Sequence, residues 1–185
     1  MTQEQEAKYA PGFLISVPQL MDPNFYHAVV LLIEHTSEGA MGLTINHPTE
    51  KSIQSLYEQM GRPWPGDDRS LLMRGGPVQP EHAWILHGPE DSLDPVYQVT
   101  DELQMNTSLD ALDELAKGSS PFRLYVGYAG WGPGQLDREI QQGAWILSDV
   151  DISLVFETPS EEVWEASLKR MGIDPAMLVM GSGVH

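Results

Sequence analysis

The sequence predicts an α+β fold in one domain. Eight short runs of β-branched and apolar residues are typical of strands, and helical periodicity is clear in fewer places. Strands and helices do not alternate strictly, which disfavours a doubly wound parallel sheet. The 185 residues, 41% hydrophobic and 20% charged, suffice for one globular core. We therefore expect a single domain over residues 1–185, with about residues 1–10 frayed because they are polar.

The expected strands are short and lie between turn-forming residues. In chain order they are residues 27–34, 40–46, 70–75, 82–88, 95–100, 122–129, 144–149 and 152–157. Residues 61–70, "GRPWPGDDRS", combine turn-forming residues with acidic ones. They predict an exposed loop between a helix and a strand.

Four helices are expected between these strands. In three of them apolar residues recur at helical spacing, the fourth is a shorter helix, and a glycine follows each as a C-terminal cap. The last helix begins with "TPSE", which predicts Thr158 as N-cap, Pro159 in the first turn and Glu161 at the capping-box position. The expected helices cover residues 53–60, 109–116, 135–142 and 159–171.

The charge of the chain limits its partners. Ten Lys and Arg residues stand against 27 Asp and Glu residues, which gives a formal net charge of −17. Lys169 and Arg170 form the only adjacent basic pair. Duplex DNA binding depends on many cationic contacts to phosphates, so direct nucleic-acid binding is not expected.

Composition also indicates a compartment. Cysteine is absent, which excludes disulfides, thiolate catalysis and thiolate metal sites. The first ten residues, "MTQEQEAKYA", have no basic start and no apolar stretch typical of a secretory signal. The longest apolar runs are too short to span a bilayer. We expect a cytoplasmic protein with no membrane association.

The stretch "GYAGWGPGQ", residues 127–135, raises the question of a phosphate site. A dinucleotide fingerprint starting at Gly130 would need a third glycine where Gln135 stands, and one starting at Gly132 would need it at Asp137. No lysine of a P-loop is near, and acidic residues follow at the start of the expected helix. The stretch therefore predicts a tight glycine turn with Trp131 and Tyr128 packed beside it.

Motifs for a metal, a cofactor or a catalytic set are also missing from the sequence. Glu34 and His35 follow a strand, but no second histidine stands at the spacing of a zinc-binding helix. His82 and His87 are five residues apart on one expected strand, so they project from opposite faces. We expect no metal and no cofactor.

Three longer stretches resemble a known family in their order and spacing. They are "GFLISVPQLMDPNFYHAVVLLIEHTSEGAMGLTINHP", "RGGPVQPEHAWILH" and "GYAGWGPGQLDREIQQGAWIL", and together with the C-terminal segment they resemble the AlgH/YqgE family of bacterial proteins. The resemblance implies a branched, mostly antiparallel or mixed sheet with a small closed barrel, surrounded by helices. It also implies a cytosolic protein of undefined biochemical activity, often described as a transcriptional regulator.

Some positions depart from the family pattern. Many members carry a cysteine where this chain has Ile33, so a redox-sensing role is not expected here. Basic residues are common at the positions of Tyr26, His27 and His47, and histidine weakens an anion site at neutral pH. Many members end in "GHA", whereas this chain ends in "GVH".

We expect a cleft for a ligand or partner where several of these segments leave their strands. Glycine and proline shape exposed backbone there, beside polar or aromatic side chains. The alternative is that these segments recur because the fold needs its turns. The candidate residues are Glu34, His35, Asn46, His47, Arg74, Gly75, Gly76, Pro77, Gly127, Tyr128, Gly130 and Trp131.

Three functions remain open. The first is a regulatory or binding protein that acts through a protein partner or a small ligand and not by direct DNA binding. The second is an enzyme of unrecognised type that uses Glu34 or His35 as an acid or base beside the glycine turns. The third, direct regulation on DNA, is disfavoured by the charge.

Overall fold

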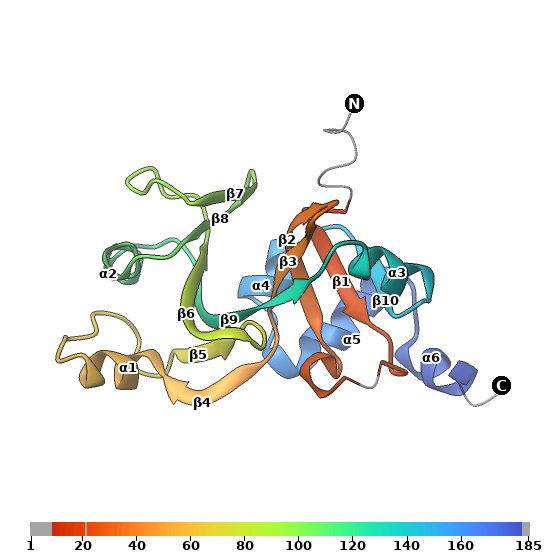
Figure 1. The fold of residues 1–185 in the computed structure, drawn as a ribbon. Coiled ribbons are helices and arrows are strands. Elements are labelled where there is room, and N and C mark those ends of the chain that lie inside the picture. The colour runs from red at the N-terminus through yellow and green to blue at the C-terminus, as the bar shows by residue number, and fades with distance from the viewer. Residues whose placement is uncertain (1–8, 21, 183–185) are drawn as a thin grey trace.

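A computed structural model describes residues 9–20 and 22–182 of the protein. Over those residues it has ten strands and six α-helices (Figure 1). The strands are β1 (Gly12–Ser16), β2 (Val29–Thr36), β3 (Gly39–Thr44), β4 (Pro48–Ser52), β5 (Leu71–Arg74), β6 (Val78–His87), β7 (Tyr97–Thr100), β8 (Leu103–Asn106), β9 (Phe122–Trp131) and β10 (Trp145–Ser148). The helices are α1 (Ile53–Gln59), α2 (Leu109–Lys117), α3 (Gln135–Gln141), α4 (Ile152–Phe156), α5 (Ser160–Arg170) and α6 (Pro175–Ser182), besides the short 3-10 helix η2 (Pro23–Phe25). The α+β class is confirmed.

The four predicted helices form, and two of them, α1 and α2, begin with a side-chain cap. In α1 the Ser52 side chain accepts a hydrogen bond from the Ser55 amide, and in α2 Ser108 does the same for Ala111. Helix α3 lies where it was expected and begins after Gly134, which has a left-handed φ of 72°. The loop over residues 61–70 contains neither helix nor strand, as predicted.

One predicted strand and one predicted cap are wrong. Residues 152–157 form α4 and not a strand, because the Asp151 carboxylate accepts a hydrogen bond from the Ser153 amide and caps a helix. Pro159 occupies the N-cap position of α5, with no side-chain cap. The Thr158 hydroxyl instead donates to the carbonyl oxygen of Ser153, in the first turn of α4, so the expected capping box does not form.

The sheet branches at β9. Residues Ala129–Trp131 pair antiparallel with β3, while the earlier part of β9 pairs antiparallel with β6 and parallel with β5. The main path runs β10-β1-β2-β3-β9-β6-β8-β7, and β4 joins through β5. Among the described strands the two ends of this path, β10 and β7, do not pair with each other, so the expected small closed barrel is not present.

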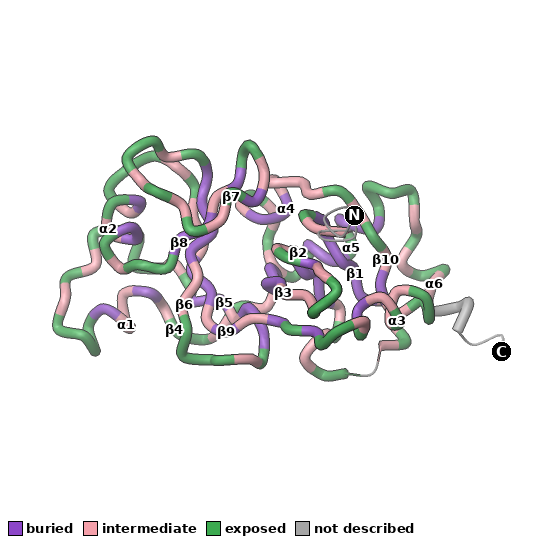
Figure 2. The backbone as a smooth tube through the Cα atoms, turned by 45° about the horizontal axis from the view of Figure 1, so that its top comes forward, coloured by how far each residue is buried: buried purple, intermediate pink, exposed green. Residues whose placement is uncertain are grey.

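Three hydrophobic clusters fill the faces of this branched sheet, and Figure 2 shows the buried segments along its strands. The first lies between β1–β3 and helices α4 and α5 and extends to Met73, Met105 and Tyr125 on the other side of the branch. The second packs α3 and Trp145 against the opposite face of β1–β3. The third holds α1 and α2 against β5, β6 and β9. The first cluster therefore connects the two halves of the sheet.

Residues 1–8, most of the segment expected to be frayed, lie outside the described residues, as does the "GVH" ending. Tyr9 and Ala10 pack against the second cluster. Among the described residues no helix combines the length and apolar character needed to cross a membrane.

Candidate functional site

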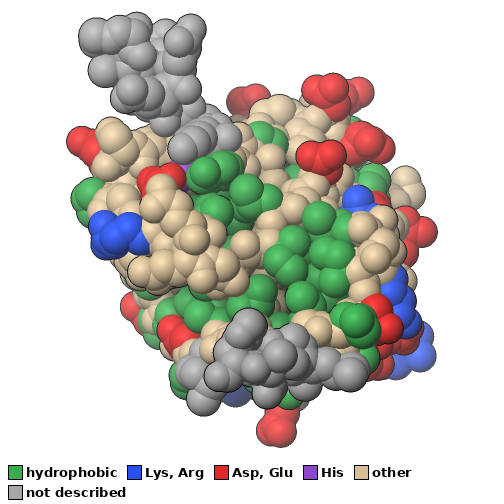
Figure 3. All heavy atoms as spheres, turned by 90° about the vertical axis from the view of Figure 1, so that its right-hand side faces the viewer, with side chains coloured by type: hydrophobic (Ala, Val, Ile, Leu, Met, Phe, Trp, Pro, Cys, Tyr) green, Lys and Arg blue, Asp and Glu red, His purple; other side chains and the backbone are tan. Residues whose placement is uncertain are grey.

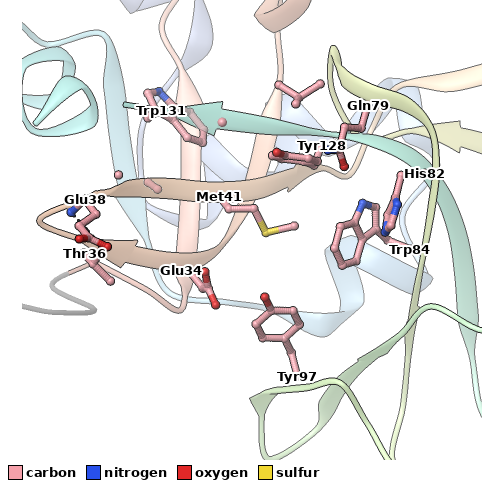
Figure 4. A pocket seen from close by; sticks show the side chains of 14 residues that line it. Glu34, Thr36, Glu38, Met41, Gln79, His82, Trp84, Tyr97, Tyr128 and Trp131 are labelled. Atoms are coloured by element: carbon pink, nitrogen blue, oxygen red, sulfur yellow. Dashed lines mark hydrogen bonds between the residues drawn. The ribbon is translucent and has the colours of Figure 1, made fainter. Parts of the chain in front are cut away.

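A cavity lies at the branch of the sheet, between the β2–β3 hairpin and strands β6, β7 and β9 (Figure 4). We call it the branch cavity. Its volume of about 660 Å³ is within the range of small-molecule sites. It is lined by Glu34, Thr36, Glu38, Gly39, Ala40, Met41, Val78, Gln79, His82, Trp84, Tyr97, Tyr128, Gly130 and Trp131.

A bulge in β2 decides which side chains reach the cavity. Leu32 is opposite Gly42 and Glu34 is opposite Met41, so Ile33 is an extra residue in this strand. Glu34 lines the branch cavity on one face of the hairpin.

His35 does not join Glu34. It is 4% exposed and stacks on Tyr9, with ring centroids 5.1 Å apart. Its Nε2 atom lies 3.5 Å from Oδ2 of Asp137 in α3. His35 therefore belongs to the packing between the sheet and α3, on the face opposite the branch cavity.

Strand β6 bends where it borders the cavity. Val78 pairs with Tyr128, but the next pair is Ala83 with Val126, so the intervening residues of β6 bulge out. Gln79 has a positive φ of 46°, a conformation that a non-glycine residue rarely adopts. Strained backbone of this kind is often found at functional sites. The bulge brings Gln79 and His82 to the cavity wall.

Three aromatic side chains from three strands face this space (Figure 4). Trp84 of β6 and Tyr128 of β9 meet edge to face, with centroids 6.2 Å apart. Tyr97 of β7 lies across from them, with its hydroxyl group facing the Glu34 carboxylate. Burial raises the pKa of Tyr97, and the Glu34 charge raises it further. Tyr97 and Glu34 thus close one side of the cavity from the two arms of the sheet.

Trp131 lines the cavity, but its indole packs on the other face of the sheet. It is 6% exposed and stacks with Phe25 at 6.0 Å. Its Nε1 atom donates to Oε1 of Glu139 at 3.0 Å, and Nε1 of Trp145 donates to the same oxygen at 2.9 Å. Glu139, an acidic residue that follows the glycine turn, therefore holds the two tryptophans in place. This arrangement gives no support to a phosphate site.

The predicted residues Asn46 and His47 lie in a second, smaller cavity of about 280 Å³. The Asn46 side chain accepts from the Val29 amide and donates to the His27 carbonyl oxygen, so it fixes the start of β2. His47 Nε2 is 3.2 Å from the carbonyl oxygen of Tyr26. Burial lowers the pKa of His47, and the nearby Arg74 charge also lowers it.

Around this second cavity, the His27 ring lies between two aromatic rings. Its centroid is 4.0 Å from that of Tyr26 and 3.9 Å from that of Trp164, with nearly parallel planes. His27 has a φ of 47°. Burial lowers the pKa of His27, while the Glu165 charge raises it.

The segment "RGGP" lines neither cavity. Arg74 donates through Nη2 to the Asn24 side chain at 3.0 Å. Gly75 and Gly76 cross β9 at Gly127 so closely that a Cβ atom on Gly127 would lie 2.3 Å from the Gly76 carbonyl oxygen. These glycines and the adjoining Pro77 belong to the crossing of two chain segments.

The structure thus brings four of the predicted residues to the branch cavity: Glu34, Tyr128, Gly130 and Trp131. It places Asn46 and His47 at the second cavity, and His35 against Tyr9 and Asp137 on the face of the sheet opposite the branch cavity. Sequence reasoning missed Met41, Trp84 and Tyr97 as cavity residues. Large apolar or aromatic residues within the strand runs were the available signal, but core packing gives the same signal.

Among the described residues, no group of three His, Asp or Glu side chains could hold a metal ion.

Comparison with known proteins identifies the class to which this fold and site belong. The model of the AlgH-like family matches residues 13–176, and the chain belongs to that family. A UPF0301 protein from Myxococcus xanthus is 38% identical, covering 95% of this chain and 98% of the relative. Another from Thioalkalivibrio sulfidiphilus is 36% identical and covers 97% of each chain.

Solved structures agree with this assignment. The solution structure of the AlgH protein from Pseudomonas aeruginosa matches with a TM-score of 0.75 at 35% identity, covering 91% of each chain. The crystal structure of protein DIP2367 from Corynebacterium diphtheriae has the same fold, with a TM-score of 0.75 at 22% identity, covering 92% of this chain and 91% of that one.

Proposed function

We propose that the protein is a binding protein that holds a small ligand, or a segment of a protein partner, in the branch cavity. The observation that carries the proposal is the convergence of Glu34, Trp84, Tyr97 and Tyr128 from four strands on one open space. Two bulges shape that space, and one of them contains a residue with positive φ. Bulges and backbone strain concentrate beside functional sites. Binding there would couple the two arms of the sheet, which suits a cytoplasmic regulator.

The alternative, an enzyme that uses Glu34 and His35 together, is disfavoured by their positions. Glu34 lines the branch cavity, whereas His35 packs against Tyr9 and Asp137. A general acid and base must both reach the same substrate. Two residues on opposite faces of one strand do not meet this requirement.

Direct action on DNA is also disfavoured. The formal net charge is −17, and on the face shown in Figure 3 the Lys and Arg side chains do not form a continuous basic patch. We predict no gel shift with duplex DNA at physiological salt and low micromolar protein. A submicromolar affinity that falls as salt rises would contradict this prediction.

The cavity proposal is tested by a thermal-shift screen of small molecules and short peptides. A ligand at ten times its Kd adds about 1.4 kcal/mol to the free energy of unfolding. For a domain of this size the melting temperature rises by about 3–5 °C.

Two glycine variants locate the binding. An added Cβ atom at Gly130 would lie 3.4 Å from its nearest neighbour, a side-chain atom of Tyr128, so Gly130→Leu can place a side chain in the branch cavity without a backbone clash. Gly132→Leu is the matched control, because Gly132 lies just beyond β9, does not line the cavity and also has room. We expect the shift to disappear in Gly130→Leu and to remain in Gly132→Leu. Equal shifts in both variants would overturn the proposal.

A further inference from the structure

Building on the proposed binding function, we infer that the branch cavity takes an organic cation: a protonated amine or a guanidinium group on an apolar body. The inference rests on the charge of the cavity wall, on its aromatic faces and on its size. The charge and the aromatic faces come from different residues.

The wall carries negative charge. Glu34 contributes a carboxylate from β2, and Glu38 contributes another from the turn that follows it. Among the described residues, no lysine or arginine lines the cavity. His82 is the one lining group that can become cationic, and it lies beside Trp84 with ring centroids 4.7 Å apart. The field inside the cavity therefore attracts cations, and the net charge of −17 adds to it at long range.

The wall is also aromatic. Trp84, Tyr97 and Tyr128 surround the space that Glu34 borders, and the Met41 side chain lies between them (Figure 4). The faces of aromatic rings attract cations, most strongly for ammonium or guanidinium groups within about 6 Å of a centroid. Carboxylates would repel an anion, and a neutral ligand would not use their charge. Aromatic rings and carboxylates together favour a cation with a hydrophobic part.

The size of the cavity argues against a bare metal ion. About 660 Å³ accommodates a group of many atoms. In the described part of the chain, no cluster of three metal-ligating side chains accompanies Glu34 and Glu38. An organic cation fills the space and meets both the carboxylates and the rings.

The cation can belong to a free amine or to a basic side chain of a protein partner. Two probes distinguish these sources: phenethylamine, and a blocked pentapeptide with one arginine between glycines. Phenethyl alcohol serves as the neutral analogue of the amine. Binding is followed by NMR through the indole N–H signals, with the Trp84 signal assigned by a Trp84→Phe variant.

The expected result is that at least one cationic probe shifts the Trp84 signal and binds more tightly than the alcohol. Glu34→Gln should weaken that binding about fivefold, the loss expected for an exposed ion pair of about 1 kcal/mol. The alcohol should be unaffected by the same change. Glu114→Gln, on the exposed side of α2 and away from the cavity, alters the net charge equally and should leave both affinities unchanged.

The outcomes separate the two levels of the proposal. Binding by the amine alone assigns a small ligand, and binding by the peptide alone assigns a partner. Two results would overturn the cation inference while leaving a binding cavity. The first is equal affinity for the alcohol and the amine. The second is amine binding that is unchanged in Glu34→Gln, when this variant has the same melting temperature as the wild type. If no probe moves the Trp84 signal while thermal shift finds another ligand blocked by Gly130→Leu, only the cation inference fails. If Gly130→Leu blocks the binding of no ligand, both the cation inference and the proposed binding function fail.

Discussion

Glu139 shows how one side chain can organise the glycine turn. Its Oε1 atom accepts hydrogen bonds from the indoles of Trp131 and Trp145, while Oε2 accepts from Gln135. Both indoles are almost fully buried. A hydrogen bond to a charged acceptor stabilises more than a neutral one, and a buried donor without a partner is costly. This carboxylate therefore fixes α3 against the end of β9.

We predict that Glu139→Ala lowers the free energy of unfolding by about 2–4 kcal/mol, because two indole donors lose their acceptor. Urea denaturation measures the change. Gln141→Ala, on the exposed side of the same helix, should cost less than about 0.5 kcal/mol. Similar losses for the two variants would show that the carboxylate does not hold the tryptophans.

Burial lowers the pKa values of His27, His47 and His87. In the unfolded chain these groups take up protons near pH 6.5, where the folded protein does not. Their effect on stability is thus absent well above pH 6.5, and stability falls as the pH drops through that value toward the lowered folded-state pKa values. We predict less stability at pH 5 than at pH 7 in urea denaturation, and a smaller difference in His47→Gln. Constant stability between pH 5 and 7 would contradict this.

At the level of elements, the crossing of β9 with the segment after β5 holds the branch of the sheet together. The Gly75 amide donates to the Val126 carbonyl oxygen at 2.8 Å. Gly127 has a φ of 75° and faces the backbone of Gly76. The short contact and the left-handed conformation both require glycine.

Gly127→Ala should therefore be far more destabilising than Gly61→Ala. Gly61 also has a positive φ, of 70°, but an added Cβ atom there meets nothing within 4 Å. We expect Gly61→Ala to cost about 1 kcal/mol, and Gly127→Ala to cost at least about 2 kcal/mol more, because the backbone must move. Equal midpoints in urea denaturation would show that the crossing tolerates a side chain.

Elements with a strong periodic signal could be predicted, and those set by a single contact could not. The stripe of Leu109, Leu112 and Leu115 was sufficient to identify α2. The polar strand β4 has no such pattern and forms by pairing with β5. In α4 the cap from Asp151 outweighs a β-branched composition. Strands β1 and β8 and helices α4 and α6 were also missed.

The candidate site was partly predicted for a related reason. Glycine turns and strand ends identified Glu34, Tyr128, Gly130 and Trp131, which line the branch cavity. His35 was expected beside Glu34, although neighbouring residues of a strand point to opposite faces. The bulge in β2 arises in its pairing with the next strand, β3, and the bulge in β6 arises in its pairing with β9, which is distant in sequence. Local periodicity contains neither register shift.

At the scale of the whole molecule, we propose that the chain folds as one cooperative domain. The first hydrophobic cluster includes residues from both arms of the sheet, from Phe13 of β1 to Met105 of β8. A shared core makes independent unfolding of one arm costly. We predict a single urea transition that coincides by fluorescence and circular dichroism.

Limited proteolysis gives a second measure of the same property. We expect the first cuts at the N-terminal segment or in the loop over residues 61–70, where the described backbone lacks helix and strand pairing. Early cleavage within β2 would show that the sheet opens before the loop and would contradict a single cooperative unit.

We propose that this protein binds its ligand in the branch cavity. A crystal structure of the protein with the ligand that gives the largest thermal shift would locate the binding site. We expect the ligand between the β2–β3 hairpin and β6, with a cationic group beside Glu34 and an apolar part against Trp84 and Tyr128. A ligand bound instead at the second cavity beside His27 and Trp164, with the branch cavity empty, would rule out the branch cavity as the binding site.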